Sequence, residues 1–293
     1  MKKTIRPHQL PWLTLIPGAL GLALRLWLYA TGIDEKGFLK AGHPAEILLW
    51  ILSAVTVALL FWLTRPIKGQ GGYRTNFPAS IPGAIGCWAA AAGIFITALG
   101  ELMAGSDGIA IAAGALGILC VPALIFAGYS RFTGSRSSFL LYALLCVYFI
   151  ARLVCQYRQW SADPQLQDYC FQLLACVGLM LASFQRATFD VKLGKRRSYA
   201  FTGLITSYFC ILSIPNCEQK LFYIVMAAWL MTNLCSLKPL RRRPAPQEPQ
   251  KAPEPAEAPQ PSKEEAPEKE LDLSDFPDLS DLLSDLMSDL EGL

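Results

Sequence analysis

The chain has 293 residues, of which 53% are hydrophobic and 17% are charged. Soluble domains contain about 45–50% apolar and about 25% charged residues, so this composition predicts a protein that is embedded largely in lipid. The formal net charge is +3, which is typical neither of a polybasic nucleic-acid-binding protein nor of an acidic disordered protein. We therefore expect the lipid bilayer, and no nucleic acid, as a partner.

Apolar segments in chain order predict eight transmembrane helices. A helix needs about 20 apolar residues to cross the hydrocarbon core, with about 17 as the lower limit. Backbone groups in lipid must be hydrogen-bonded within the protein, which makes these segments helical. The predicted spans are residues 10–31, 47–64, 75–100, 108–130, 138–157, 169–185, 198–217 and 221–237. The predicted fold is an all-α, polytopic integral membrane protein with a transmembrane domain at residues 10–238.

The positive charge of the predicted loops alternates along the chain. If the segment 1–9 is cytoplasmic, the inner segments carry 17 Lys and Arg residues and the outer loops carry four. Short loops with an excess of Lys and Arg stay on the cytoplasmic side. We therefore expect a multi-pass protein of the cell membrane with both termini in the cytoplasm. The first apolar run contains Arg25 and is too long for a signal-peptide core, which favours a retained helix.

The spans 75–100 and 108–130 are rich in small residues, which let helix backbones approach closely when they are spaced four apart. The small residues are Gly86, Ala90, Gly93, Ala110, Ala113, Gly114 and Gly117. Because the connection between the two spans is short, they predict an antiparallel hairpin, with a homodimer face as the alternative. Pro122 predicts a kink or a break near the middle of the second span, and broken helices recur in transporters.

Four ionisable side chains fall inside the spans or at their ends, and all four are expected in the outer third of the bilayer. They are Arg25, Glu46, Glu101 and Arg152. Such residues mark functional or pairing sites. One interpretation is that the arginines reach the membrane surface while the glutamates sit at the boundary. The others are interhelical ion pairs, for example between Arg25 and Glu101, and a ligand or ion site in an outward-facing polar pocket.

Catalytic signatures are missing from the sequence. It contains no HExxH, GxSxG or Walker A motif, and no aspartate or histidine lies within a predicted span. The sequence therefore favours a protein that is not an enzyme, although it does not exclude one. It predicts no catalytic residue, no metal site and no cofactor.

The composition changes sharply after the last span. Residues 239–270 are rich in Pro, Glu and Ala, which predicts a disordered linker. Residues 271–293 predict an acidic amphipathic helix. Its apolar stripe comprises Leu279, Leu282, Leu283, Leu286, Met287 and Leu290. An acidic polar face is unsuited to an anionic membrane surface, so the stripe favours a helix that binds a protein groove. A solvated, mostly disordered end is the alternative.

The net charge of +3 conceals two opposite regions. Residues 244–293 have a net charge of −11, and the rest of the chain has +14. This complementarity predicts that residues 271–293 bind a soluble basic protein or the chain's own cytoplasmic loop 186–197. The first functional hypothesis is therefore a membrane scaffold or regulator that recruits a soluble partner through this helix. The alternative is a small-solute or ion transporter that uses the outward-facing polar pocket.

Overall fold

The structure is a computed structural model, and it describes most of the segment in which the sequence predicts membrane-spanning helices. The described residues are 9–33, 39, 42–67, 69–104, 108–135, 138–161, 169–215, 217 and 219–237. The predicted linker 239–270 and the predicted helix 271–293, with its apolar stripe from Leu279 to Leu290, lie outside the described residues.

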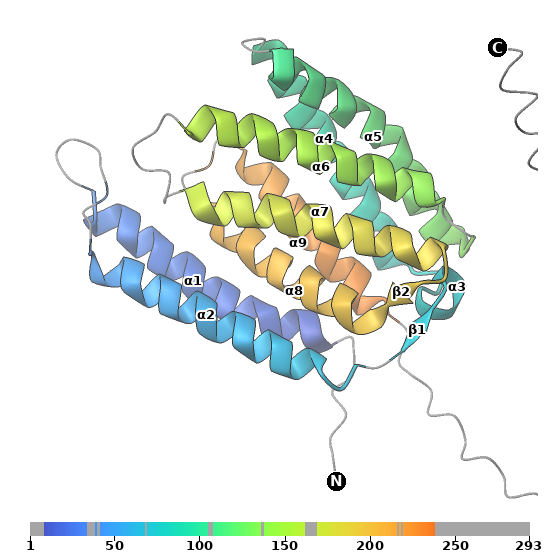
Figure 1. Ribbon diagram of the computed structural model, residues 1–293, viewed down its shortest axis with the longest axis horizontal. Helices are drawn as coiled ribbons and strands as arrows, with labels where there is room; N and C mark the ends of the chain where they lie inside the picture. Colours follow the sequence, from blue (N-terminus) through green and yellow to red (C-terminus); the bar gives the residue numbers. More distant parts are fainter. Residues whose placement is uncertain are drawn as a thin grey trace, which may run out of the picture. The chain divides into compact units, whose positions relative to one another are not determined.

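The described residues form a helical bundle that carries a two-residue β-ladder at one end (Figure 1). The long helices are α1 (Leu10–Thr31), α2 (Pro44–Thr64), α4 (Ile81–Ala104), α5 (Gly108–Thr133), α6 (Phe139–Trp160), α7 (Cys170–Asp190), α8 (Arg196–Leu212) and α9 (Lys220–Cys235). The short helix α3 (Tyr73–Asn76) follows strand β1 (Gln70–Gly71). Strand β1 pairs antiparallel with β2 (Gly194–Lys195).

Six of the helices, α1, α2 and α4 to α7, are long and apolar enough to cross a membrane. Helix α8 has 17 residues and α9 has 16, so both are shorter than these six. The predicted number of eight spans therefore goes beyond the candidates that length and composition support. The lower hydropathy of α8 has a physical reason, because this helix packs against α1, α2, α7 and α9. A helix covered by other helices presents little surface to lipid.

Six helices close into a ring. Each helix from α4 to α9 packs against the next along the chain, and α9 packs against α4. Helices α1 and α2 pack on the α8 side of this ring (Figure 1). Large apolar side chains such as Trp62 and Leu140 lie exposed on the outside, whereas Arg25, Arg152 and Arg186 are buried. Soluble proteins show the reverse distribution, so this arrangement is typical of a protein embedded in a membrane.

Two helices extend further than the predicted spans. Helix α5 ends at Thr133 and α7 ends at Asp190, so Arg131 and Arg186 lie inside helices and are buried. The charge count places both arginines in inner loops, and this placement is wrong. Helix α5 also continues through Pro122, so a break at this residue is not present.

Helix α4 begins later than the predicted span 75–100. The chain forms the separate helix α3 and then passes through Phe77, which has an extended backbone with φ −120° and ψ 96°. The following residue is Pro78, and a residue that precedes proline is disfavoured in the helical region. The interruption therefore follows from local sterics.

The small residues of α4 and α5 serve two interfaces. Helices α4 and α5 pack together, and a Cβ atom on Gly117 would lie 2.7 Å from the Cβ of Ala98. On α4, however, Gly86 faces Thr232 and Gly93 faces Val225, both in α9. The hairpin prediction therefore gives the wrong neighbour for these two glycines, because a face lined by small residues does not identify the helix that covers it.

Candidate polar binding site at one end of the bundle

The predicted charged residues lie toward one end of the bundle, where α4 and α6 end and α5 and α7 begin. We call this end the pocket end. Glu46 is in the first turn of α2 and Glu101 in the last turn of α4, while Arg25 and Arg152 are in the halves of α1 and α6 nearest this end. The structure brings Glu101 and Arg152 into direct contact.

Arg152 and Glu101 form a short ion pair between α6 and α4. The Nη1 atom of Arg152 donates a hydrogen bond to Oε1 of Glu101 at 2.6 Å. The Arg152 side chain is 0% exposed and the Glu101 side chain is 12% exposed. Charges removed from water are costly unless they are paired and hydrogen-bonded, so each of these two groups compensates the burial of the other.

Further contacts hold the Arg152 guanidinium in place. Its Nη2 atom donates to Oε1 of Gln219, and its Nη1 atom also lies 3.4 Å from the hydroxyl of Tyr148. The guanidinium carbon is 4.0 Å from the ring centre of Phe222, within the range of a cation–π interaction. Since Gln219 and Phe222 belong to the start of α9, the arginine joins three helices.

A cavity of about 540 Å³ lies beside the ion pair. Its polar lining comprises Glu101, Gln156, Gln159, Gln172 and Gln219, together with Trp160, Tyr169 and two cysteines. The rings of Trp160 and Tyr169 are stacked, with centroids 4.4 Å apart and an interplanar angle of 10°. The pocket therefore combines one carboxylate, several amides and an aromatic wall.

Two acceptor atoms of this lining are buried without a hydrogen-bond partner among the described residues. They are Oε2 of Glu101 and Oε1 of Gln172. Gln156 differs, because its Oε1 accepts from the thiol of Cys176 at 3.0 Å and its Nε2 lies 3.4 Å from the hydroxyl of Tyr223. A buried acceptor without a donor costs about 1–3 kcal/mol. The pocket thus suits a ligand that brings N–H or O–H donors.

Arg25 is buried in a different contact. Its Nη1 atom donates to the carbonyl oxygen of Leu212 at 2.6 Å, and its Nη2 atom donates to the hydroxyl of Tyr29 at 3.0 Å. The guanidinium carbon is 5.1 Å from the ring centre of Phe171. Arg25 therefore fixes α1 against α7 and α8, and its charge points into the bundle.

Glu46 is half-buried in the first turn of α2, where a carboxylate interacts favourably with the helix dipole. His43 is the N-cap of this helix, and its Nδ1 accepts a hydrogen bond from the backbone N–H of Ala45 at 3.3 Å. The position of Glu46 in this first turn is therefore explained by the start of the helix. Glu46 is not part of the pocket lining.

The glutamines of the pocket were missed by the sequence reasoning, which searched only for charges. A signal was present, because Arg152, Gln156 and Gln159 follow one another at positions i, i+4 and i+7 of one helix. Such spacing places polar groups on one face. In the part of the chain that the structure describes, no group of three His, Cys, Asp or Glu side chains could hold a metal ion.

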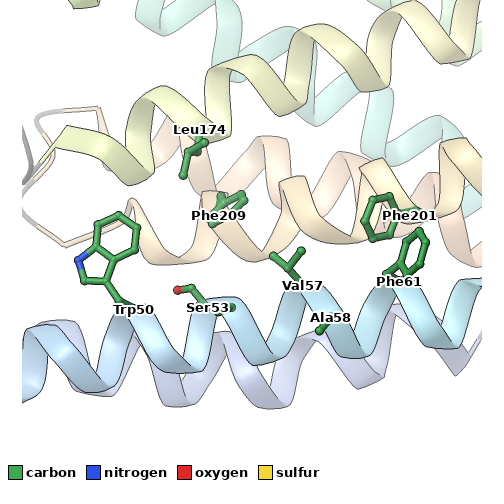
Figure 2. Close-up of a pocket in the computed structure, with 9 residues that line it drawn as sticks. Trp50, Ser53, Val57, Ala58, Phe61, Leu174, Phe201 and Phe209 are labelled. Carbon is green, nitrogen blue, oxygen red and sulfur yellow. The ribbon is translucent and has the colours of Figure 1, made fainter.

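A second cavity, of about 560 Å³, lies on the side of the bundle between α2, α7 and α8 (Figure 2). Its lining is apolar and aromatic, with Trp50 and Phe61 of α2 facing Phe201 and Phe209 of α8. The hydroxyl of Ser53, which also lines the cavity, already bonds to the carbonyl of Leu49 and to Tyr208. This second cavity therefore offers mainly apolar surface to a ligand.

Comparisons with known protein families, with characterised proteins and with solved structures find no match to this chain.

Proposed function

We propose that the chain is an eight-helix protein of the cell membrane, with α8 and α9 as its last two spans and both termini in the cytoplasm. The support is the loop charge, 15 Lys and Arg residues against four once the buried Arg131 and Arg186 are left out, together with the packing of α8 against α7 and of α9 against α4, both of which are candidate spans. In this orientation the pocket end faces outward.

We further propose that the pocket binds a small polar solute that donates hydrogen bonds, and that the protein transports this solute. The observation that carries the proposal is the pair of buried, unpartnered acceptors on Glu101 and Gln172 in one cavity. Because Arg152 neutralises the carboxylate charge, the pocket suits a neutral polyol or a compact ammonium compound. The stacked Trp160 and Tyr169 provide the apolar wall that ligand pockets need.

Thermal unfolding of the purified full-length protein tests the solute-binding step of this function. Ethanolamine and glucose carry donors, whereas tetramethylammonium has the charge without N–H groups. We expect a donor-bearing compound to raise Tm, because a ligand that binds only the folded state stabilises it. The substitution Gln172→Met removes one free acceptor without touching the ion pair and should abolish the shift.

The matched control is Arg158→Gln, an exposed residue of the same helix as two of the pocket glutamines. This variant should respond as the wild type does. An equal shift in the Gln172→Met protein, or no shift with either donor-bearing compound, contradicts solute binding. Alkaline phosphatase fused between α4 and α5 should be active and the same enzyme fused after α5 inactive, and the opposite result contradicts the orientation.

We also propose a second function, the recruitment of a soluble partner through residues 271–293. The supporting observation is the net charge of −11 on residues 244–293. If the helix instead binds the chain's own segment 186–197, the exposed side chains of Lys192, Lys195 and Arg197 offer the positive charge. Arg186 contributes none to this surface, because it is buried.

A photo-crosslinker at Leu286 in the full-length protein distinguishes a soluble partner from the chain's own segment 186–197. Crosslinks to the peptide that contains Lys192 and Lys195 indicate the intramolecular contact, and a discrete soluble protein indicates recruitment. A crosslinker at Ser284, on the polar face of the predicted helix, is the control. Equal and diffuse labelling from both positions contradicts a bound helix.

A further inference from the structure

The opposite end of the bundle, where α5 and α7 end and β1 pairs with β2, holds a second polar cluster. Its centre is formed by Arg131 of α5 and Arg186 of α7, which are 0% and 1% exposed. We call this cluster, together with Tyr73, Phe77 and Tyr142, the arginine end. It is separate from the cavity at the pocket end.

Aromatic rings surround the two guanidinium groups. The Cζ atom of Arg186 lies 3.9 Å from the ring centre of Phe77, 4.5 Å from that of Tyr73 and 4.8 Å from that of Tyr142. The Cζ atom of Arg131 lies 4.9 Å from the same Phe77 ring. Cation–π contacts offset only part of the cost of removing a charge from water, and the two like charges also repel each other. The rings alone therefore do not compensate this pair.

Most of the hydrogen-bond donors of the two arginines are unused. Nε, Nη1 and Nη2 of Arg186 are buried without a partner among the described residues, as are Nε and Nη1 of Arg131. The Nη2 atom of Arg131 donates to the hydroxyl of Ser236. The hydroxyls of Tyr73 and Tyr142 are also buried without a partner in the described part of the chain. Buried polar groups in proteins are nearly always hydrogen-bonded, so this collection of donors indicates an acceptor that comes from elsewhere.

A carboxylate of the described chain does not supply that acceptor. Asp190 lies one helical turn beyond Arg186, yet it accepts none of the N–H groups of this arginine. The pocket end differs, since Glu101 bonds directly to Arg152 there. Among the described residues, neither arginine of the arginine end therefore has a hydrogen bond to a carboxylate, although Asp190 attracts Arg186 electrostatically.

A cavity of about 420 Å³ lies beside the cluster. Tyr73 lines this cavity and also contacts Arg186. The exposed side chains of Arg74 and Lys192 line it as well, together with Asp190. With two cationic side chains and one carboxylate, the lining carries a net positive charge, which attracts anions to this end of the bundle.

We propose that the arginine end binds a phosphate group, with Arg186 as its main contact, Arg131 as the second positive charge, and the hydroxyls of Tyr73 and Tyr142 as further donors. The planar guanidinium group matches phosphate oxygens in pairs. A phosphate dianion balances both arginines and accepts from several donors at once, whereas a carboxylate carries one charge and two oxygens. The phosphate belongs either to a soluble molecule or to a lipid headgroup, and the two sources can be distinguished.

The first test is thermal unfolding of the delipidated full-length protein in detergent, in potassium phosphate and in potassium chloride of equal ionic strength. At about 100 times the dissociation constant, phosphate should raise Tm by about 5–10 °C. Arg186→Met should remove this response. Arg186→Lys should weaken it, because lysine keeps the positive charge but lacks the planar guanidinium group with its paired N–H donors. Arg197→Gln removes an exposed charge at the same end and should keep the full response.

The second test addresses the lipid source. Nanodiscs that contain phosphatidic acid are compared with nanodiscs that contain diacylglycerol of the same acyl chains, which lacks only the phosphate. If the ligand is a lipid headgroup, phosphatidic acid raises Tm, diacylglycerol does not, and free phosphate has no effect. This rise in Tm should also depend on Arg186.

Tyr142→Phe covers the case in which the Arg186 variants fail to fold. It keeps the ring that contacts Arg186 and removes the hydroxyl, so it should weaken phosphate binding about tenfold, as expected for one hydrogen bond to a charged group. The proposal is overturned by no response to phosphate or phosphatidic acid in the wild type. Equal responses in the wild type and in a folded Arg186→Met or Tyr142→Phe protein also overturn it.

Discussion

Arg152 and Arg186 are both buried, one toward each end of the bundle, and both lie about 4 Å from a phenylalanine ring. Their counter-charges differ. Arg152 bonds to Glu101 at 2.6 Å, whereas all three guanidinium nitrogens of Arg186 are without a hydrogen-bond partner among the described residues. A buried arginine is therefore not by itself part of a structural ion pair. The same substitution should therefore change stability in opposite directions at the two ends.

The largest effect is expected from Arg152→Met. This variant leaves the Glu101 carboxylate buried without its partner and should reduce stability by about 3–5 kcal/mol. The measurement is thermal unfolding in detergent, monitored through tryptophan fluorescence. The double variant Arg152→Met with Glu101→Leu removes both charges and should regain most of the loss. If the double variant is as unstable as the single one, the ion pair is not the reason for the loss.

Arg186→Met should have the opposite sign. In phosphate-free, delipidated protein the substitution replaces a buried charge that has no hydrogen bond to a carboxylate with an apolar side chain of similar length. Replacing buried charges by well-packed apolar groups can stabilise a protein by about 1–4 kcal/mol. The same unfolding assay measures the gain. A loss comparable to that of Arg152→Met would show that the two ends do not differ as described.

Gly83→Ala tests how closely Arg131 approaches α4. A Cβ atom at this position would lie 2.8 Å from Nη2 of Arg131 and 2.6 Å from Oγ of Ser80. Such overlap should cost about 1–3 kcal/mol. Gly100 lies in the same helix, and a Cβ atom there would have no neighbouring atom within 4 Å among the described residues. Gly100→Ala should therefore increase stability by about 0.5–1 kcal/mol. Equal effects at both glycines contradict the close approach.

The smallest effect is expected at the wall of the pocket. Trp160→Leu removes the stacked contact with Tyr169 and should cost about 0.5–1.5 kcal/mol beyond the lost apolar area. Binding of a solute that uses this wall should weaken in the same variant. Titration of the solute separates the two effects, because a purely structural stack changes Tm and leaves the affinity unaltered.

The sequence was sufficient to predict the helical membrane-protein class, because charge-free apolar segments and loop charges are local properties. It was insufficient for the neighbours of those helices. Gly86 and Gly93 pack on α9 although the nearest small-residue helix in the sequence is α5. Which helix covers a given face depends on how all helices close the ring, and no single segment contains that information.

The candidate sites were predictable in part for a similar reason. Glu101 and Arg152 stood out because charges are rare in apolar segments, and they lie in contact. Arg131 and Arg186 did not stand out, because arginines near helix ends also mark loops. Their burial depends on Tyr73 and Phe77, which reach them from a distant turn of the chain. The paired and the unpaired arginine become distinguishable only when these long-range contacts are known.

The closure of α9 against α4 has a consequence for how the protein is made. The face of α4 that carries Gly86 and Gly93 is covered by side chains of α9, which leaves the ribosome after all the other helices of the ring. Gln219 and Phe222, which hold Arg152, are also synthesised at that late stage. Until then the growing chain must keep α4 and Arg152 in the membrane without their final neighbours. Assembly of the bundle, and of the pocket with it, therefore completes only after α9 has been synthesised.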